Sequence, residues 1–136
     1  MIPTIYSTNA RSLFAKFDDF IDKLVHNRID IAEITETWQD INKNDHNKKI
    51  ELLENVHGYK CYSFARKKYR DNGSLTGGGG VAIFVNQRNF NSSKIDHIIV
   101  PRNLEVVWVQ VFPKTKSDVK VFYIQQTKLK NQDSFE

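Results

Sequence analysis

The stretch IDIAEITETW, residues 29–38, carries the pattern that decides the fold. Residues 29–35 are largely apolar and rich in isoleucine, which predicts a short buried β-strand. Glu36 stands where this strand ends, and Trp38 follows in the outgoing loop. From spacing alone a solvated glutamate is the simpler interpretation, and Trp38 is interpreted as a packing residue that anchors the loop.

The segments before this strand predict a crossover between two parallel strands. Residues 2–8 begin apolar and predict a strand, and residues 11–28 place their apolar side chains on one helical face. The order strand, amphipathic helix, strand is typical of a parallel crossover unit. The apolar face of the helix comprises Leu13, Phe14, Phe17, Phe20, Ile21, Leu24 and Val25.

Asn9 and Glu36 form the first candidate site. Each follows a predicted parallel strand, and the carboxyl ends of such strands share the sheet edge at which α/β proteins place ligands. A carboxylate beside an amide at that edge has the oxygen ligands that a hard divalent cation prefers. The alternative stays open at this point: Asn9 or Ser12 caps the helix, and Glu36 is solvated.

The remainder of the chain predicts one further helix and several strands. Residues 48–58 predict a short helix that ends at Gly58. Residues 77–80 are all glycine, lack the ending of a phosphate-binding loop, and predict a hinge where the backbone packs closely. We expect a single α+β domain over residues 1–136, with about seven strands and two helices. The further strands are predicted at residues 59–64, 81–85, 94–100, 105–112 and 119–125, followed by a polar tail at 127–136.

Composition and charge limit the functional classes. The chain has 136 residues, of which 40% are hydrophobic and 26% charged, as in a globular domain. A net charge of +4 is compatible with an anionic partner such as nucleic acid, although mild basicity also serves solubility. The segment RKKYR, residues 66–70, suits phosphate contact and base stacking, and equally suits a solvated hairpin loop.

Cysteine, histidine and hydropathy argue against several alternatives. Cys61 is the single cysteine, so an intrachain disulfide is excluded, and the four histidines lack the spacing of metal ligands. No apolar stretch approaches the ~20 residues of a membrane span, and the N-terminus lacks a signal pattern. We therefore expect an intracellular protein that does not enter a membrane.

The ordered motifs resemble the endonuclease/exonuclease/phosphatase superfamily, and most of all the apurinic-endonuclease-like domain of non-LTR retrotransposons. NARSL and ITETW are particularly typical of that branch, and the likeness covers nearly the whole chain. The segments that carry it, in order, are STNARSL (7–13), IDIAEITETW (29–38), GYKCYSFAR (58–66), GGGGVAIFV (77–85), LEVVWVQVF (104–112) and VFYIQQ (121–126).

This resemblance implies a fold, an activity and a set of site residues. The fold is a four-layered α/β sandwich, in which two β-sheets are flanked by helices. The activity is magnesium-dependent nicking of target DNA in the nucleus, which leaves a 3′ hydroxyl that primes a reverse transcriptase. Asn9 and Tyr123 match catalytic residues, the latter contacting the scissile phosphate, and Glu36 matches the metal ligand. Arg11 and Arg66 fall in family positions where DNA contact is expected, and the basic segment adds Lys67, Lys68 and Arg70 as candidates for DNA binding.

The sequence also departs from the family pattern. The later Asp-x-Asn segment and the terminal Ser-Asp-His segment, which include the catalytic histidine, are missing, and Asp40-Ile41-Asn42 lies too early to replace the first. Glu33 places a charge inside a predicted buried strand, which is costly unless the charge is paired. We therefore expect only the N-terminal part of the domain, with its C-terminal portion missing and bare strand edges where that portion pairs.

Whether the chain is an enzyme by itself stays open at this stage. The favoured interpretation is an incomplete endonuclease domain that is inactive or weakly active alone, with DNA and either a reverse transcriptase or the missing C-terminal half as partners. The alternatives are a non-catalytic nucleic-acid-binding module and a degenerate mobile-element remnant. DNA binding that weakens with salt, without nicking, is the outcome that favours the binding module.

Overall fold

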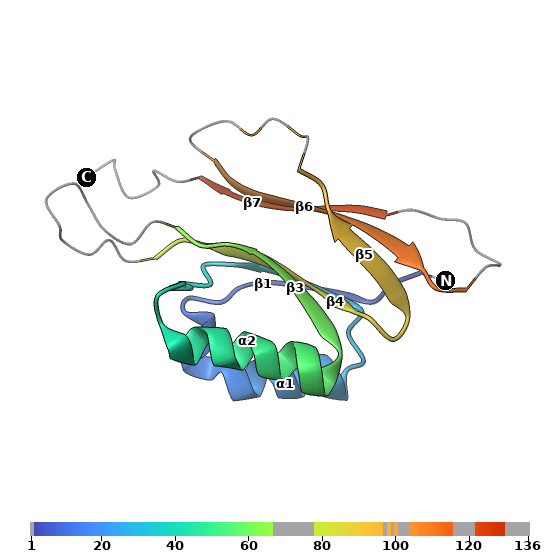
Figure 1. The fold of residues 1–136 in the computed structure, drawn as a ribbon, viewed down its shortest axis with the longest axis horizontal. Helices are drawn as coiled ribbons and strands as arrows, with labels where there is room; N and C mark the ends of the chain where they lie inside the picture. Colours follow the sequence, from blue (N-terminus) through green and yellow to red (C-terminus); the bar gives the residue numbers. More distant parts are fainter. Residues whose placement is uncertain are drawn as a thin grey trace, which may run out of the picture.

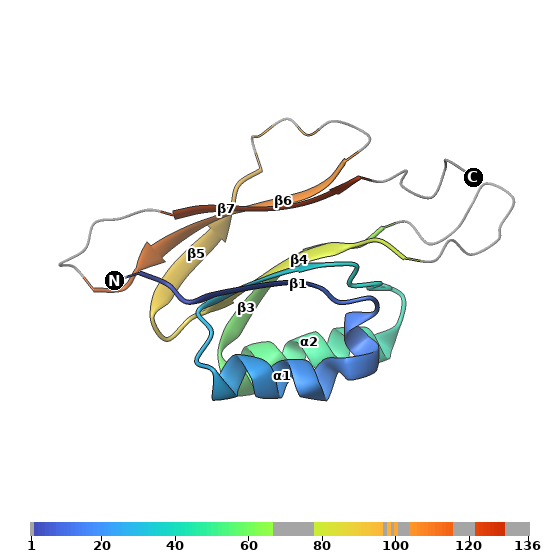
Figure 2. The ribbon, with the colours of Figure 1, turned by 180° about the vertical axis from the view of Figure 1, so that it is seen from behind.

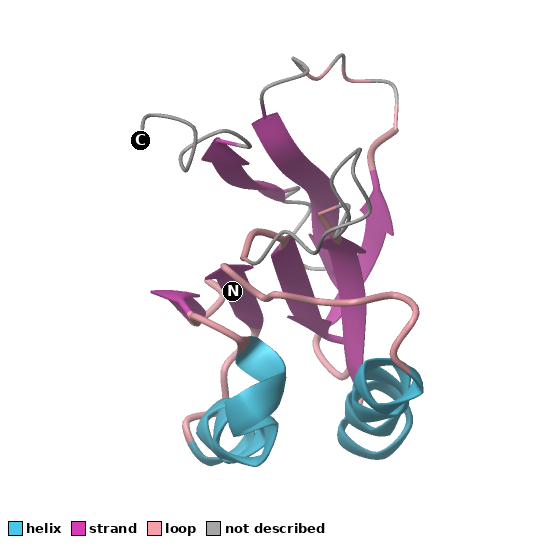
Figure 3. Ribbon diagram, turned by 90° about the vertical axis from the view of Figure 1, so that its left-hand side faces the viewer, coloured by secondary structure: helices cyan, strands magenta, loops and turns pink. Residues whose placement is uncertain are grey.

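The computed structural model describes residues 2–66, 78–96, 98, 100, 104–115 and 122–129, and these form two β-sheets and two α-helices (Figure 1). The helices cover one face of the first sheet, and the second sheet packs on its other face (Figure 3). This arrangement confirms the predicted α+β class and gives three layers of the expected sandwich. Within the described ranges, neither helix is long and apolar enough to cross a membrane.

The first sheet is built around the predicted parallel crossover. Its strand order is β1-β2-β4-β3, with β1 parallel to β2 and the other neighbours antiparallel. The chain passes from β1 to β2 through a short 3-10 helix and α1, as the amphipathic pattern predicts. In chain order, these elements are β1 (Ile5–Asn9), η1 (Leu13–Lys16), α1 (Phe17–His26), β2 (Ile31–Thr35), α2 (Asn44–His57), β3 (Tyr59–Phe64) and β4 (Val81–Asn86).

Apolar side chains fix both helices on the first sheet. Phe20 of α1 meets Phe84 of β4 edge-on, with ring centroids 5.1 Å apart. Leu24 of α1 and Leu53 of α2 are fully buried in the same cluster. Burying a side chain of this size stabilises the folded state by about 1.5–3 kcal/mol relative to leaving it exposed. Gly58 ends α2 in the left-handed region at φ 74°, which confirms the predicted helix end.

The second sheet is antiparallel, in the order β5-β6-β7. Its strands are β5 (Phe90–Lys94), β6 (Leu104–Pro113) and β7 (Phe122–Leu129). Alternate residues of β6 point to the first sheet, and Val107, Val109 and Val111 are buried against Ile83 and its neighbours. The core between the sheets therefore rests on β-branched side chains that alternate with half-exposed ones.

Several predicted boundaries were wrong. The strand expected at residues 94–100 lies instead at Phe90–Lys94, because Phe90 is fully buried between the sheets and forms the start of the pairing with β6. The helix expected at 48–58 begins at Asn44, and the Asn47 side chain there bonds the carbonyl of Ile41. Ser12 occupies the N-cap position of η1, but its side chain makes no capping hydrogen bond, and the Asn9 side chain accepts the backbone N–H of Arg11.

The β1 strand is the most open part of the first sheet. It lies at the sheet edge, and its residues are exposed or half-buried, whereas every residue of β4 is buried (Figure 2). Ile5 is 49% exposed on the face that continues the core between the sheets. Among the described strands, β2 is the one that pairs with β1, so the other edge of β1 has no hydrogen-bonded strand among them.

Candidate functional site

The ends of β1 and β2 meet, as the parallel crossover predicts. Asn9 pairs with Thr35 in the last position of the ladder, and the two chains continue side by side beyond it. The N–H of Ser12 donates to the carbonyl of Glu36 at 3.0 Å, and the N–H of Leu13 donates to that of Thr37 at 3.1 Å. Asn9 and Glu36 therefore stand on adjoining segments at the carboxyl edge of the sheet.

Backbone strain concentrates in these two segments. Glu36 and Trp38 have φ of 56° and 54°, and Arg11 and Ser12 have φ of 44° and 76°. Residues other than glycine rarely adopt this left-handed region, and each instance costs of the order of 1–3 kcal/mol. Such conformations persist only where surrounding contacts hold them, so the contacts of Glu36 explain how the segment keeps this shape.

Two N–H donors among the described residues orient the Glu36 carboxylate. Its Oε2 accepts the indole N–H of Trp38 at 2.5 Å and the backbone N–H of Gly79 at 2.9 Å. The interpretation of Trp38 as a packing residue was wrong, because its side chain is 40% exposed and binds the carboxylate instead. The indole N–H and the N–H of Gly79, which belongs to the glycine turn at residues 78–80, together fix the position of the carboxylate.

Gly80 approaches the Glu36 segment too closely for a side chain. Gly79 accepts the N–H of Trp38 at 2.9 Å, and Gly80 accepts that of Thr37 at 3.3 Å. A Cβ at Gly80 would lie 2.3 Å from the Thr37 hydroxyl, and Gly80 has φ of 88°. The predicted close backbone packing is therefore present at residues 78–80, while position 77 lies outside the described residues.

A buried ion pair supports the turn from the second sheet. Glu105 at the start of β6 is fully buried, and it accepts the Arg66 guanidinium twice, at 3.2 and 3.1 Å. It also accepts the backbone N–H of Gly80 at 3.2 Å. Sequence reasoning missed Glu105, and the one available signal is a carboxylate directly before a run of β-branched residues.

The other predicted site residues differ in where the structure places them. Asn9 and Arg11 are exposed beside the Glu36 segment. Arg66 turns its guanidinium to Glu105 and is 13% exposed, so its contact with DNA stays a prediction. The predicted DNA-contacting residues Lys67, Lys68 and Arg70 lie outside the described residues.

Tyr123 lies on β7 of the second sheet. It stands opposite Gln110 of β6, five positions from Glu105, which is about 17 Å at the rise of a β-strand. Tyr123 is 62% exposed, whereas the next residue, Ile124, points into the core. Its catalytic role therefore stays a prediction.

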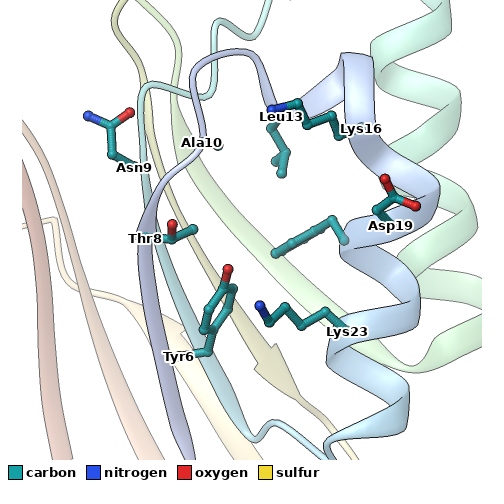
Figure 4. Close-up of a pocket in the computed structure, with 9 residues that line it drawn as sticks. Tyr6, Thr8, Asn9, Ala10, Leu13, Lys16, Asp19 and Lys23 are labelled. Atoms are coloured by element: carbon teal, nitrogen blue, oxygen red, sulfur yellow. The ribbon is translucent and has the colours of Figure 1, made fainter.

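A cleft of about 260 Å³ lies on the other face of β1. Tyr6 and Thr8 of β1 face Lys23 of α1 across it, and the Lys23 ammonium lies 4.8 Å from the centre of the Tyr6 ring (Figure 4). The Asn9 side chain points away from α1 in the same view. Asn9 nevertheless belongs to the residues that line the cleft, so the cleft adjoins the strand end that presents the Asn9 amide.

The Glu36 site fits a cation that is held mainly by water and phosphate. No group of three acidic, histidine or cysteine side chains that could hold a metal ion occurs among the described residues. Magnesium, however, is commonly held by only one or two carboxylates, with water and phosphate oxygens completing its shell. One oriented carboxylate at an open sheet edge suits that kind of binding, and it does not suit a closed protein cage.

Burial shifts the pKa of two groups that lie apart from Glu36. Burial raises the pKa of the Cys61 thiol to about 12, so the thiolate needed for nucleophilic catalysis is scarce at neutral pH. Burial also raises the pKa of Glu33, which lies half-buried at the centre of β2. Burial therefore disfavours the ionised form of Glu33, which is the cost that the sequence predicts for a carboxylate inside this strand.

The fold is shared with known structures. The human Nocturnin catalytic domain with bound sulfate matches 92% of this chain with a TM-score of 0.56 and 18% identity. An endonuclease/exonuclease/phosphatase protein from Bacteroides vulgatus matches 92% with a TM-score of 0.57 and 14% identity, and a humanized D. rerio TDP2 matches 96% with a TM-score of 0.54 and 11% identity. The chain has the fold of the endonuclease/exonuclease/phosphatase superfamily.

The match covers only part of each superfamily structure. This chain spans 49%, 51% and 52% of the three proteins, in the order given above. It therefore represents a partial domain of the endonuclease/exonuclease/phosphatase sandwich. A scan with protein-family models gives no match, and a comparison with curated protein sequences gives none either.

Proposed function

We propose that the chain is the N-terminal portion of a magnesium-dependent DNA endonuclease domain, like those of non-LTR retrotransposons. The observation that carries the proposal is the Glu36 carboxylate at the end of β2, oriented by Trp38 and Gly79 in a strained segment. The superfamily fold supports it, because the same fold is found in nucleases and phosphatases.

In this proposal each residue at the carboxyl ends of β1 and β2 has a separate role. Glu36 holds the magnesium ion together with water and phosphate oxygens. The bound ion supplies positive charge that stabilises the phosphoryl oxygens and the leaving group. The Asn9 amide, on the adjoining strand end, donates to a phosphate oxygen or a water, and the exposed Arg11 guanidinium contacts the DNA backbone. The proposed roles of Tyr123 and of the basic segment 66–70 are contacts with the phosphates of the nicked strand and of the duplex.

The chain alone is proposed to be inactive or to nick slowly. A general base beside the metal is needed to activate water for in-line attack, and the family segment that includes the catalytic histidine does not occur in this sequence. The chain also spans about half of its structural neighbours. The partners we propose are DNA in the nucleus and, in the parent polypeptide, the complementary C-terminal half or a reverse transcriptase.

A plasmid assay tests this function. Supercoiled DNA is incubated with the parent chain, Glu36→Ala, or Glu51→Ala, which removes an exposed carboxylate of α2. We expect magnesium to strengthen DNA retention and to support slow nicking at most, with both effects lost in Glu36→Ala and kept in Glu51→Ala. Retention that falls with salt but ignores magnesium and Glu36 overturns the proposal, and it favours the non-catalytic binding module.

A further inference from the structure

The proposed function gives no task to Glu105, the fully buried carboxylate of β6. Its oxygens accept three N–H groups, two from the Arg66 guanidinium and one from Gly80. Removing a carboxylate from water costs free energy, and the two hydrogen bonds from the Arg66 guanidinium offset part of that cost. The ion pair lies directly beside the glycine turn, and this position indicates that it stabilises the conformation of the turn.

The contacts form a continuous path from Glu105 to Glu36. Glu105 holds Gly80 by its N–H, and the adjacent Gly79 donates its own N–H to Glu36. The turn also accepts the backbone N–H of Trp38, whose indole is the second donor to Glu36. Displacing Gly79 therefore removes one donor to Glu36 and loosens the residue that supplies the other.

Arg66 packs directly on this path. A Cβ placed at Gly79 would lie 2.2 Å from the Arg66 Nε, so the guanidinium fills the space beside that glycine. At Gly78 a Cβ would lie 3.3 Å from Glu36 Oε2 and 4.0 Å from Arg66 Nη1. The guanidinium thus supports the turn from one side while Glu105 fixes the guanidinium.

We propose that Glu105 is a positioning residue for Glu36, acting through Arg66 and the Gly79–Gly80 turn to fix the carboxylate for cation binding. The proposal rests on the metal role given to Glu36 above. It adds a contribution of the second sheet, because a residue of β6 then determines the geometry of a ligand on the first sheet. Groups that orient metal ligands in this way typically affect metal affinity by about 10–100-fold.

The first test needs no metal. Glu105→Gln keeps the size of the side chain and removes the charge that holds Arg66. Hydrogen exchange is followed by NMR at the indole N–H of Trp38 and the amide of Gly79. We expect exchange at both to accelerate by at least about 10-fold more than at the amide of Ile83, in the centre of β4, which reports the loss of global stability. Parent rates at Trp38 and Gly79, or an acceleration no larger than that at Ile83, overturn the positioning role.

The second test measures cation binding with terbium, a luminescent ion that prefers oxygen ligands. Trp108→Phe leaves Trp38 as the only tryptophan, so sensitised emission reports ions near Glu36. We expect Glu105→Gln to weaken terbium binding by about 10–100-fold, and Glu51→Gln, an equal charge change on exposed α2, to leave it unchanged. Unaltered terbium affinity in Glu105→Gln overturns the proposal.

The two tests separate this inference from the proposed function. If Glu36→Gln leaves terbium binding intact, the metal role of Glu36 fails, whereas the exchange experiment still tests whether Glu105 positions Glu36.

Gly79→Ala offers a second test if Glu105→Gln does not fold, because the Cβ added at residue 79 displaces Arg66. Gly58→Ala is the matched control, because Gly79 and Gly58 have similar φ values, of 77° and 74°. A Cβ at Gly58 would approach only the Arg88 side chain, at 3.9 Å. We expect accelerated Trp38 exchange in Gly79→Ala alone, and equal behaviour of the two variants contradicts the inference.

Discussion

Replacing Glu105 with alanine is expected to cause a large loss of stability. The change removes a fully buried carboxylate, takes its two contacts from Arg66, which is 13% exposed, and leaves the Gly80 N–H without its acceptor. Removing one partner of a buried ion pair costs about 3–5 kcal/mol, because the other charge stays buried. That is a substantial share of the ~5–15 kcal/mol that stabilises a typical domain.

Urea unfolding followed by circular dichroism measures this loss. Asp45→Ala is the control, because its pair with Lys49 is also short, at 3.2 Å, but has side chains 72% and 33% exposed, and we expect a loss below about 1 kcal/mol. The double variant Glu105→Met, Arg66→Met is expected to lose less than Glu105→Ala, since it buries no single charge. A Glu105→Ala protein within about 1 kcal/mol of the parent would refute the reasoning.

Three further predictions concern Glu33, Cys61 and Tyr59. Because burial raises the pKa of Glu33, its protonated form favours folding; this contribution is full below the unfolded value of 4.5 and is lost as pH rises through the folded pKa. Glu33→Gln is therefore expected to unfold at higher urea than the parent at pH 7 and at equal urea below pH 4.5, and equal midpoints at both pH values would contradict this. Cys61, a half-buried thiol whose pKa is raised to about 12, is expected to react with iodoacetamide at pH 8 far more slowly when folded than in urea; equal rates would contradict the raised pKa. Tyr59→Phe removes a hydroxyl that bonds the carbonyls of Leu24 and Ile29 at 3.2 and 2.6 Å, and we expect a loss of about 1 kcal/mol in urea unfolding, which an unchanged midpoint would rule out.

The parallel crossover was predictable because its signals are local. The helical period of residues 11–28 and the β-branched run after it lie within a few turns of chain, and each indicates its element without reference to the rest. The meeting of Asn9 and Glu36 then follows from the geometry of parallel strands. The open edge at β1 was likewise anticipated, from the absence of the segments that complete the family pattern.

The support of Glu36 was not predictable, because it depends on partners distant in sequence. Glu105 and Arg66 are 39 residues apart, and neither has a neighbour in sequence that signals their pairing. The hydrogen bond between Trp38 and Glu36 forms where both residues have left-handed backbone, which their side chains do not favour. The glycine turn alone gave a usable signal, since four consecutive glycines indicate a close approach.

The position of β5 was missed for a different reason. The apolar run before Pro101 has the composition of a strand, whereas the strand that forms contains asparagine and two serines. Phe90 is fully buried and decides this outcome, together with the pairing of β5 along β6. Tertiary burial thus overrides local β propensity here.

The most direct test of the account is where a divalent cation binds. Manganese replaces magnesium at oxygen sites, and its paramagnetism broadens NMR signals near it. At substoichiometric manganese we predict broadening centred on Glu36, the Trp38 indole and Gly79, and its loss in Glu36→Gln. Broadening centred instead on the exposed acidic residues of α1, Asp18 and Asp19, or unchanged broadening in Glu36→Gln, would contradict the account.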